Sequence, residues 1–370
     1  MNTLPCTTVD VCVITDEGYA VPTLVMLTSM RENQAAQTKY RVHFFYLELP
    51  ELYLRKAEEL ASERFELIFH PIDRAALTEP SACSTLTAHV SPAALIKFRL
   101  PELLAELDKV LYLDGDIIVC RDLAEMYATQ LGSSLVAAVP DCHQEYSELA
   151  GSPICERGRY FNSGVMLLNL AHMRKRNTPQ AMMMASCSLP SPRRFMDQDA
   201  INIACAGETR MLPISCNALV LYLQRYPIEF TNEVYGTSFR SWLEAESGFA
   251  LLHFAGQPKP WKFCNTPYSA VWMHYYNLSP FRHCEWRRDL APTLPFTFTL
   301  RQSLYTLSLQ IMGKLPLISV EQAGNTTRIR LLRALTLMRV EDNKGLSRFY
   351  LFGLIPAGSA KLGAAFPPSP

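Results

Sequence analysis

The chain has 370 residues, of which 49% are hydrophobic and 19% are charged, a composition that can bury a substantial core and excludes a disordered chain. Basic and acidic side chains both number 35, so the net charge is zero and we expect no nucleic-acid partner. No apolar run reaches the roughly eighteen residues of a membrane-spanning helix, and the first residues lack a signal-peptide pattern. We therefore expect a cytoplasmic globular protein.

The charge is unevenly distributed along the chain. Residues 1–279 carry 23 basic and 30 acidic side chains, whereas residues 280–370 carry 12 basic and 5 acidic ones. A basic segment after an acidic body is typical of chains that meet an anionic surface such as lipid headgroups, and it is equally typical of an ordinary solvated helix. Both interpretations stay open at this point.

The 11 cysteines are odd in number and form no C-x-x-C pair. Cys12, Cys120 and Cys205 lie inside apolar runs, which predicts reduced, buried thiols in place of a disulfide framework. Cysteine usage therefore agrees with a cytoplasmic location.

Taken in chain order, the expected elements alternate between strands and helices. A strand at 9–15 precedes a helix at 19–30, a strand at 40–47, a helix at 51–62 and a strand at 65–69. A helix at 92–107, which Pro101 should kink or split, leads to strands at 110–113, 135–139 and 164–168, a helix at 197–206 and a strand at 250–254. This alternation predicts an α/β fold with a mostly parallel sheet, whose ligands bind beyond the carboxyl ends of the strands.

The pattern changes after about residue 280. Segments 301–310 and 327–340 are predicted to be helical, because leucines and arginines intersperse there. Residues 357–370, rich in Ala, Gly and Pro, are predicted to be a disordered tail. We thus expect a main domain over 1–279, a small helical basic extension over 280–356, a tail over 357–370, and no internal repeat.

An acidic turn follows the strand at 110–113, in the segment KVLYLDGDIIVC. Asp114 and Asp116 flank Gly115 between two apolar runs, and carboxylates this close repel unless a cation lies between them. Such a cation would neutralise a departing diphosphate. A solvated hairpin turn would have the same short motif, but the apolar flanks favour a buried metal site.

His253, in the segment LLHFAGQPKPW, is a candidate third ligand. A single histidine is more often a hydrogen-bonded core residue than a ligand. Here Gly256 and Lys259 follow it, and such residues suit a phosphate through close backbone approach and positive charge. Two carboxylates and an imidazole favour Mn²⁺, with Mg²⁺ as the alternative.

Four segments in this order resemble one known family: LYLDGDIIV, FNSGVMLLNL, DQDAIN and HFAGQPKPW. They are similar to the retaining glycosyltransferases of family 8, which include bacterial lipopolysaccharide galactosyl- and glucosyltransferases and glycogenin. The resemblance covers about residues 9–265. It implies a GT-A fold, a Rossmann-like nucleotide-sugar-binding domain over residues 1–279, with UDP-hexose as donor and a saccharide or glycolipid as acceptor.

The resemblance also implies roles for individual residues. Asp114, Asp116 and His253 would bind the metal, with Gly115 in the turn between the two acids. The remaining matches concern the donor. Thr15, Asp16 and Tyr19 would contact the uridine, Asp141 and Asn162 the sugar, and Gly256 and Lys259 the diphosphate. Lys97 stands where the family commonly has an arginine, and Arg99 would take that place in another helix register. Gly18 departs from the asparagine that is usual in the uridine loop.

Gln198 and Asp199 match the pair beside the anomeric carbon. A glutamine is a poor nucleophile, so this match favours attack by the acceptor hydroxyl on the face that UDP leaves, with retention of configuration. Asp199 is the alternative nucleophile for a double displacement. Relatives that act on lipopolysaccharide work at the inner membrane, so the segments RIRLLRALTLMR and SRFYLFGLIP are expected to meet an anionic membrane surface.

Three other functions remain open from the sequence. A phosphohydrolase of the haloacid dehalogenase type also has D-x-D after a strand, but a threonine or a Gly-Thr pair should then follow, and Ile117 stands there instead. A non-catalytic carbohydrate-binding protein could keep the same fold. A glycogenin-like primer that glucosylates itself would need an acceptor tyrosine, and the chain has 16 tyrosines.

Overall fold

The computed structural model describes residues 6–73, 92–141, 159–188, 196–256, 259–261 and 267–282, together with the backbone of seven strands between 298 and 361. The chain divides into two compact units, which are described separately here. The first unit contains Met1–Gln257 and His274–His283, and the second contains Pro258–Met273 and Cys284–Pro370. The expected main domain over 1–279 thus differs by the short segment Pro258–Met273, which goes with the second unit.

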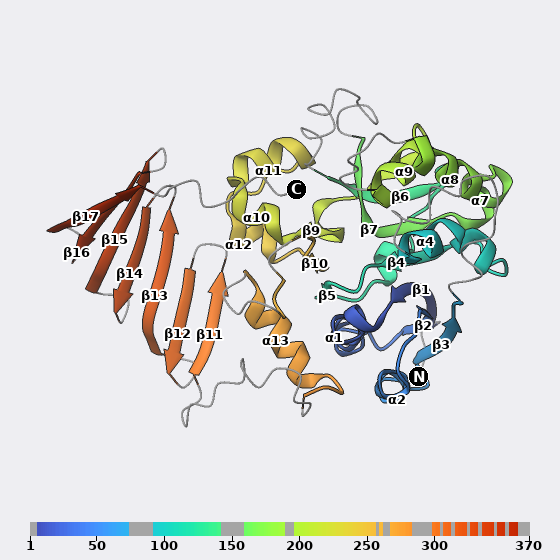
Figure 1. Cartoon of the computed structure of the whole chain (residues 1–370), viewed down its shortest axis with the longest axis horizontal. Coiled ribbons are helices and arrows are strands. Elements are labelled where there is room, and N and C mark those ends of the chain that lie inside the picture. Colours follow the sequence, from blue (N-terminus) through green and yellow to red (C-terminus); the bar gives the residue numbers. More distant parts are fainter. Residues whose placement is uncertain are drawn as a thin grey trace. The chain divides into compact units, whose positions relative to one another are not determined.

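The first unit is built on a seven-stranded sheet of order β3-β2-β1-β4-β7-β6-β8 (Figure 1). All its strand pairs are parallel except the two that β7 makes with β4 and β6. The mostly parallel α/β sheet expected from the sequence is therefore confirmed. Its strands are β1 (Thr7–Thr15), β2 (Thr38–Tyr46), β3 (Phe65–Pro71), β4 (Val110–Leu113), β6 (Val136–Pro140), β7 (Phe161–Leu168) and β8 (Thr209–Met211).

Helices cover the sheet and connect its strands, as the alternating pattern predicts. α4 continues through Pro101 and ends at Leu103, so the helix is not split at Pro101 and is four residues shorter than the expected 92–107. The helices are α1 (Ala20–Glu32), α2 (Glu51–Glu58), α4 (Pro92–Leu103), α5 (Ala124–Tyr127), α7 (Leu170–Lys175), α8 (Thr178–Ser188), α9 (Met196–Ala204), α10 (Val220–Arg225), α11 (Ile228–Tyr235), α12 (Trp242–Glu246) and α13 (Ser269–Leu278), with 3₁₀ turns η1 (Glu17–Tyr19) and η2 (Ile214–Cys216).

The central strands form the core because their side chains are apolar on both faces. β4 and β7 are buried at every position, which is expected of strands covered by helices on both sides. The described cysteines are free thiols, and Cys12 and Cys205 are fully buried as expected, whereas Cys120 is only partly buried. Within the described residues, no helix combines the length and the apolar character needed to cross a bilayer.

The acidic turn is the point where the chain leaves the main sheet. β5 (Ile117–Val119) does not pair back onto β4, as a hairpin would, but joins a second, three-stranded sheet of order β5-β10-β9. In that sheet β10 (Leu251–His253) runs antiparallel to β5 and parallel to β9 (Ala218–Leu219). The hairpin interpretation of the acidic turn is therefore excluded.

The helical expectation for residues 280–356 is wrong. The backbone there forms a seven-stranded antiparallel meander, with no helix among its described residues. Its strands are β11 (Phe298–Ser303), β12 (Thr306–Ile311), β13 (Leu315–Ala323), β14 (Thr326–Leu331), β15 (Leu335–Asn343), β16 (Leu346–Leu351) and β17 (Ile355–Lys361). The last strand also overturns the disordered tail for residues 357–361, while residues 362–370 lie outside the described residues.

The physical reason is that polar and apolar residues alternate along these strands with a period of two residues. Cross-strand partners lie on the same face of a sheet, and Arg328 is opposite Arg339. One position along, Val320, Ile329 and Met338 are successive partners, which puts apolar residues on the other face. The alternation of polar and apolar positions favours strands, and it outweighs the helix propensity of leucine and arginine.

The meander also contains a repeat, so the expectation of no internal repeat is wrong. Its register shifts at Leu309/Gln310, again at Ile329/Arg330, and again at Phe349/Tyr350, so the irregularity recurs every 20 residues. The segments LPLISVEQA and LTLMRVEDN begin successive 20-residue units, at Leu315 and Leu335. Each unit is one β-hairpin, and this accounts for the spacing.

Candidate active site

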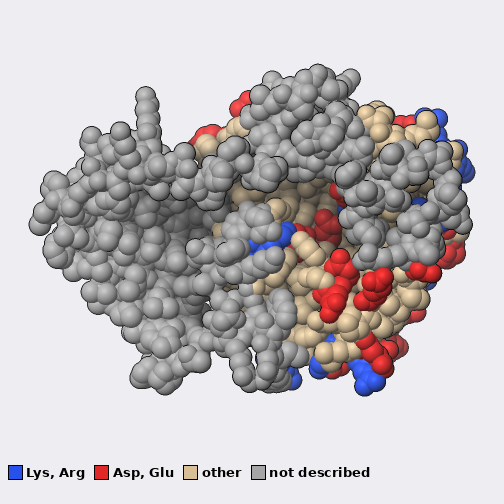
Figure 2. Space-filling model, viewed as in Figure 1, with Lys and Arg blue, Asp and Glu red and all other residues tan. Residues whose placement is uncertain are grey.

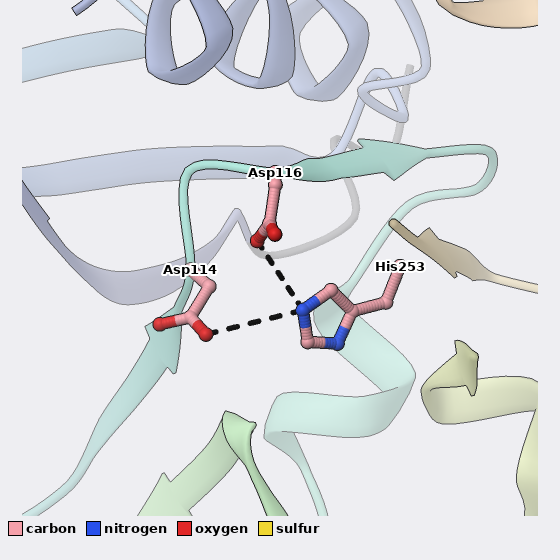
Figure 3. A group of neighbouring side chains, drawn as sticks. All are labelled: Asp114, Asp116 and His253. Carbon is pink, nitrogen blue, oxygen red and sulfur yellow. Dashed lines mark ion pairs between the residues drawn. The ribbon is translucent and has the colours of Figure 1, made fainter. Parts of the chain in front are cut away.

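The acidic turn and the distant histidine meet at one wall of a cavity. Asp114 follows β4, Asp116 precedes β5, and His253 ends β10. Because β10 runs antiparallel to β5 with His253 opposite Ile117, pairing brings the imidazole next to the turn. Figure 3 shows the three side chains pointing toward one another, and one ligand atom from each lies within 4.8 Å of the other two.

The His253 imidazole is almost fully buried, and its Nε2 makes no hydrogen bond within the described residues. That nitrogen lies 3.2 Å from Asp116 Oδ1 and 3.9 Å from Asp114 Oδ2. A buried polar atom without a partner is destabilising, and so are two adjacent carboxylates. One divalent cation bound by the imidazole and both carboxylates would satisfy all three groups, so this donor set fits Mn²⁺ or Mg²⁺.

Lys97 on α4 holds the acidic groups from the other side. Its Nζ lies 2.7 Å from Asp197 Oδ2 and 3.5 Å from Asp114 Oδ1. Burial alone would lower the pKa of Lys97, but the two carboxylates raise it above the usual value, so the ammonium stays charged. The Tyr112 hydroxyl donates to Asp114 Oδ1 at 2.6 Å, so that oxygen is held while Oδ2 faces His253.

Two glycines leave the space that this cluster occupies. A Cβ on Gly164 of β7 would lie 2.3 Å from His253 Cε1 and 2.6 Å from Asp114 Oδ2. A Cβ on Gly115 would lie 2.2 Å from Thr23 Oγ1 of α1. These distances are far shorter than real Cβ contacts, so any other residue at either position would displace a neighbour.

Beside the metal-ligand cluster lies a cavity of about 300 Å³ whose floor consists of buried amides and a carboxylate. Asn162 Nδ2 donates to Asp141 Oδ2 at 3.2 Å and to Gln198 Oε1 at 3.1 Å. Gln198 Nε2 donates to the same Asp141 oxygen at 3.0 Å. The three residues expected near the sugar therefore meet in one network at the cavity wall.

Asp199, by contrast, does not line this cavity. Its Oδ1 accepts a hydrogen bond of 2.5 Å from the Tyr160 hydroxyl, whose pKa is raised by burial and by that carboxylate. Gln198 Nε2 also donates to the Tyr160 oxygen. Asp199 thus lies behind Gln198 and braces the network.

A second cavity of about 300 Å³ shares the acidic turn with the first and extends to the end of β1. Thr15, Asp16 and Tyr19 line it, as do Lys97 and Gly115. Asp16 caps the 3₁₀ turn η1 by accepting a hydrogen bond from the Tyr19 amide at 3.0 Å. Tyr19 lines this cavity and is 39% exposed.

The remaining expected residues separate into three cases. Gly256 lines the first cavity with a φ of +73°, a conformation that favours glycine. Arg99 is exposed and pairs with Glu102, so Lys97 is the helix residue that faces the site. Lys259 belongs to the second unit, where it is buried with its Nζ 5.5 Å from the Trp261 ring centre, and its expected contact with a diphosphate stays a prediction.

Sequence reasoning assigned no function to four residues of this constellation: Tyr112, Tyr160, Asp197 and Asn217. The salt bridge from Asp197 to Lys97 lowers the pKa of the Asp197 carboxyl against the opposing effect of burial. Tyr112 lies two residues before Asp114 and could have been found, because both side chains of a strand at that spacing point to one face. Asn217 had no sequence signal, since only strand pairing brings it to His253.

A mostly parallel α/β sheet that ends in an Asp-Gly-Asp turn, with a histidine against the turn and an amide-lined cavity beside it, is the architecture of the GT-A class of glycosyltransferases. The chain belongs to glycosyl transferase family 8, whose family model matches residues 10–264. The family expected from the four motifs is thereby confirmed.

Curated relatives agree with this family. A lipopolysaccharide 1,2-glucosyltransferase of Escherichia coli is 26% identical over 283 residues, which cover 74% of this chain and 79% of that protein. General stress protein A of Bacillus subtilis is 26% identical over 195 residues, 51% of this chain and 66% of that protein.

Solved structures share the fold. An active-site mutant of LgtC matches with a TM-score of 0.60 at 22% identity, and covers 75% of this chain and 99% of its own. The bifunctional glycosyltransferase WbbM in its apo form matches with a TM-score of 0.65 at 21% identity, over 79% of this chain and 53% of its own, so this chain spans about half of that protein. These likenesses confirm the GT-A fold.

Proposed function

We propose that this chain is a metal-dependent, retaining hexosyltransferase that transfers glucose or galactose from a UDP-sugar to a saccharide acceptor of lipopolysaccharide or a related oligosaccharide. The observation that carries the proposal is the buried, unpartnered Nε2 of His253 facing Asp114 and Asp116 at a cavity wall. The relative named as a lipopolysaccharide 1,2-glucosyltransferase makes UDP-glucose the first donor to test.

The two cavities on either side of the acidic turn fit the two halves of such a donor. The uridine would lie in the cavity at the end of β1, with Thr15 and Asp16 offering polar atoms and Tyr19 its exposed ring. The hexose would lie over Asp141 and Asn162 in the other cavity. The diphosphate then falls at the turn itself, between Gly256 on one side and Lys97 on the other.

Asp114, Asp116 and His253 would hold the cation, which when bound neutralises charge that develops on the leaving diphosphate. Lys97 contributes a buried positive charge beside the same turn. The bond between the anomeric carbon and the UDP oxygen breaks, and the acceptor oxygen bonds to that carbon on the same face. The acceptor proton passes to the phosphate oxygen that leaves.

Two observations favour this front-face route over a double displacement. The Gln198 side chain, which lines the sugar cavity, is an amide and a poor nucleophile. Asp199 accepts a hydrogen bond from Tyr160 and does not line the cavity, so an attack from its carboxylate would need the network to rearrange. A sugar trapped covalently on Asp199 in the unmodified enzyme would contradict this mechanism.

The basic C-terminal segment adds a proposal about location, namely that the protein associates peripherally with an anionic inner-membrane surface. Its support is the charge of this segment, because residues 280–370 carry 12 basic and 5 acidic side chains. Arg328→Gln/Arg339→Gln should lower co-sedimentation with anionic vesicles and leave transfer to a soluble acceptor unchanged.

The decisive experiment is a screen of UDP-sugars with the purified chain. With Mn²⁺ we expect UDP release from UDP-glucose or UDP-galactose, and loss of release in metal-free buffer. Phosphate release from simple phosphomonoesters, without UDP release from any UDP-sugar, would refute the proposal in favour of a phosphohydrolase. Incorporation of labelled hexose into the chain itself would indicate a self-glucosylating primer instead.

A further inference from the structure

The amide of Asn217 lies between the metal ligands and the sugar cavity and hydrogen-bonds in both directions. It follows the 3₁₀ turn η2 and precedes β9, whose pairing with β10 puts it beside His253. Its side chain is fully buried. Asn217 Oδ1 lies 2.9 Å from His253 Nδ1, and its Nδ2 lies 2.9 Å from Asn162 Oδ1.

The orientation of these amides follows from the backbone. Gly164 N–H points at Asn162 Oδ1 at 3.0 Å, and Ser163 N–H points at Gln198 Oε1 at 3.1 Å. A backbone N–H can only donate, so the atoms that receive these hydrogen bonds must be oxygens. The Asn162 oxygen therefore faces Asn217, which must present its NH₂ group to it.

The same reasoning fixes the proton on the histidine. With its NH₂ group facing Asn162, Asn217 has only its carbonyl oxygen left for the imidazole, so His253 Nδ1 must donate and carry the proton. In the neutral imidazole, Nε2 is then unprotonated and its lone pair faces Asp114 and Asp116. That tautomer is the one in which a histidine binds a metal through Nε2.

We infer that Asn217 is a positioning residue that sets the metal-binding tautomer of His253 and couples it, through Asn162, to the amides of the sugar cavity. This series of hydrogen bonds begins at the Gly164 backbone N–H and ends at the His253 imidazole. Rotation of Asn162 by a bound hexose would therefore change the hydrogen bond that orients the His253 imidazole. Loss of the metal would in turn change the orientation of the amides in the sugar cavity. This inference rests on the proposed function for its substrate, but the tautomer can be measured without one.

The first test is the ¹⁵N spectrum of the metal-free protein labelled at histidine, with the His253 signals assigned by their loss in His253→Gln. We expect a single tautomer protonated at Nδ1 in the unsubstituted chain, and a mixture of tautomers in Asn217→Leu. Protonation at Nε2 in the unsubstituted chain would overturn the inference, whatever the enzyme transfers.

The second test is Mn²⁺ affinity in the presence of UDP, which requires no turnover. Removing the partner of a metal-bound histidine typically lowers metal affinity by about 10–100-fold, and we expect that loss for Asn217→Leu. Asn217→Asp keeps an acceptor for His253 Nδ1, but it replaces the NH₂ group that faces Asn162 Oδ1 with a carboxylate oxygen. It should hold Mn²⁺ within about threefold of the unsubstituted chain while the KM for the donor sugar rises about tenfold or more.

Asn232→Leu is the matched control, because Asn232 makes a comparable set of hydrogen bonds, to Thr237 and Phe239 beside α11. It should lower the Tm without changing Mn²⁺ affinity. If Asn217→Leu binds Mn²⁺ as tightly as the control variant does, the positioning role is refuted. If Asn217→Leu does not fold, the test is made with Asn217→Asp, which should keep its Mn²⁺ affinity and show a raised KM for the donor sugar. If the unsubstituted chain binds Mn²⁺ and shows the expected tautomer but releases UDP from no UDP-sugar, the proposed function fails and the inference about Asn217 stands.

Discussion

The two sides of the candidate site differ in how far the protein satisfies its own polar groups. On the metal side, His253 Nε2 has no hydrogen-bond partner among the described residues, and two carboxylates face it within 4 Å. On the sugar side, both ends of the Gln198 amide are hydrogen-bonded, and so are both ends of Asn162. The proposed cation would satisfy the groups of the first side, whereas the amides of the second side already satisfy one another.

The two sides differ in this way because the metal side buries carboxylates, whereas the sugar side buries mostly neutral amides. A bare imidazole lone pair next to two carboxylates is unfavourable until a cation enters, so binding free energy of the metal should order this side. Neutral amides can satisfy one another and keep one geometry without a ligand. Figure 2 shows acidic side chains gathered on the described surface of the first unit, in keeping with the acidic excess of residues 1–279.

The largest effect is expected from removing charge on the metal side. Asp116→Asn replaces a carboxylate that lies 3.2 Å from His253 Nε2 and should lower transfer about a thousandfold, or about 4 kcal/mol. UDP release at saturating UDP-glucose and Mn²⁺ measures the loss. Glu58→Gln, at an exposed acid on α2, is the control and should leave the rate unchanged. Retention of the full rate by Asp116→Asn would mean that the two sides do not differ in their need for a cation.

The next effect concerns the lysine that compensates the acidic side. Lys97→Met would leave Asp197 and Asp114 without their buried cation and should lower the free energy of unfolding by about 3–5 kcal/mol. Denaturant unfolding measures the change. Lys109→Met is the matched control, because Lys109 donates to the Tyr127 carbonyl and lies over the Tyr127 ring, without a carboxylate partner among the described residues. Equal losses in both variants would show that Lys97 acts only by packing.

A smaller effect is expected at the glycine of the turn. Gly115→Ala would bring a Cβ within 2.2 Å of Thr23 Oγ1 and should cost about 1–3 kcal/mol of stability, with weaker Mn²⁺ binding. Thr23→Ala removes the clashing oxygen, so the double variant should recover much of the Mn²⁺ affinity, leaving only the Thr23 Cβ contact at 3.3 Å. Isothermal titration of Mn²⁺ into the single and double variants is the measurement, and no recovery would locate the defect outside this contact.

The smallest effect lies away from both sides, on β3. Burial and the neighbouring His43 lower the pKa of His70, so its contribution to stability is complete above the unfolded pKa near 6.5 and is lost as pH falls through the folded pKa. His70→Phe keeps an aromatic ring against Phe45 and should flatten the dependence of the unfolding free energy on pH below about 6.5. Transfer should not change. His274→Phe on α13 is the exposed control, and an equally steep profile in His70→Phe would contradict the assignment.

Much of the first unit follows from local sequence patterns. Buried parallel strands give short apolar runs, so β4 and β6 were predicted within one residue of their ends. The acidic turn was identifiable because its two carboxylates and their apolar flanks are contiguous in the chain. Identification of Gln198 and Asn162 relied on the family motifs, and the structure brings both to one cavity.

The C-terminal segment shows where local patterns mislead. Leucines and arginines at mixed spacings satisfy a helical and an alternating pattern together, and pairing between neighbouring strands decided for the second. The 20-residue unit is visible in the sequence once the hairpins are known, because LPLISVEQA and LTLMRVEDN are identical at four of nine positions. The paired residues of this meander lie close in the chain, as Ala323 opposite Thr326 and Ile318 opposite Leu331 show, so a test for a two-residue period over short windows could have found the hairpins.

The sequence by itself determined the α/β class, the family and the acidic turn, because periodicity and short motifs depend on residues that are neighbours in the chain. Only the tertiary structure decided that β5 leaves β4 and pairs with β10, which is what carries His253 to Asp116. The pairing of β9 with β10 places Asn217 behind the imidazole, and packing of the folded chain brings Asp199 to the Tyr160 hydroxyl. These relations join residues that are remote in the chain, so they exist only once the strands have paired and the core is packed.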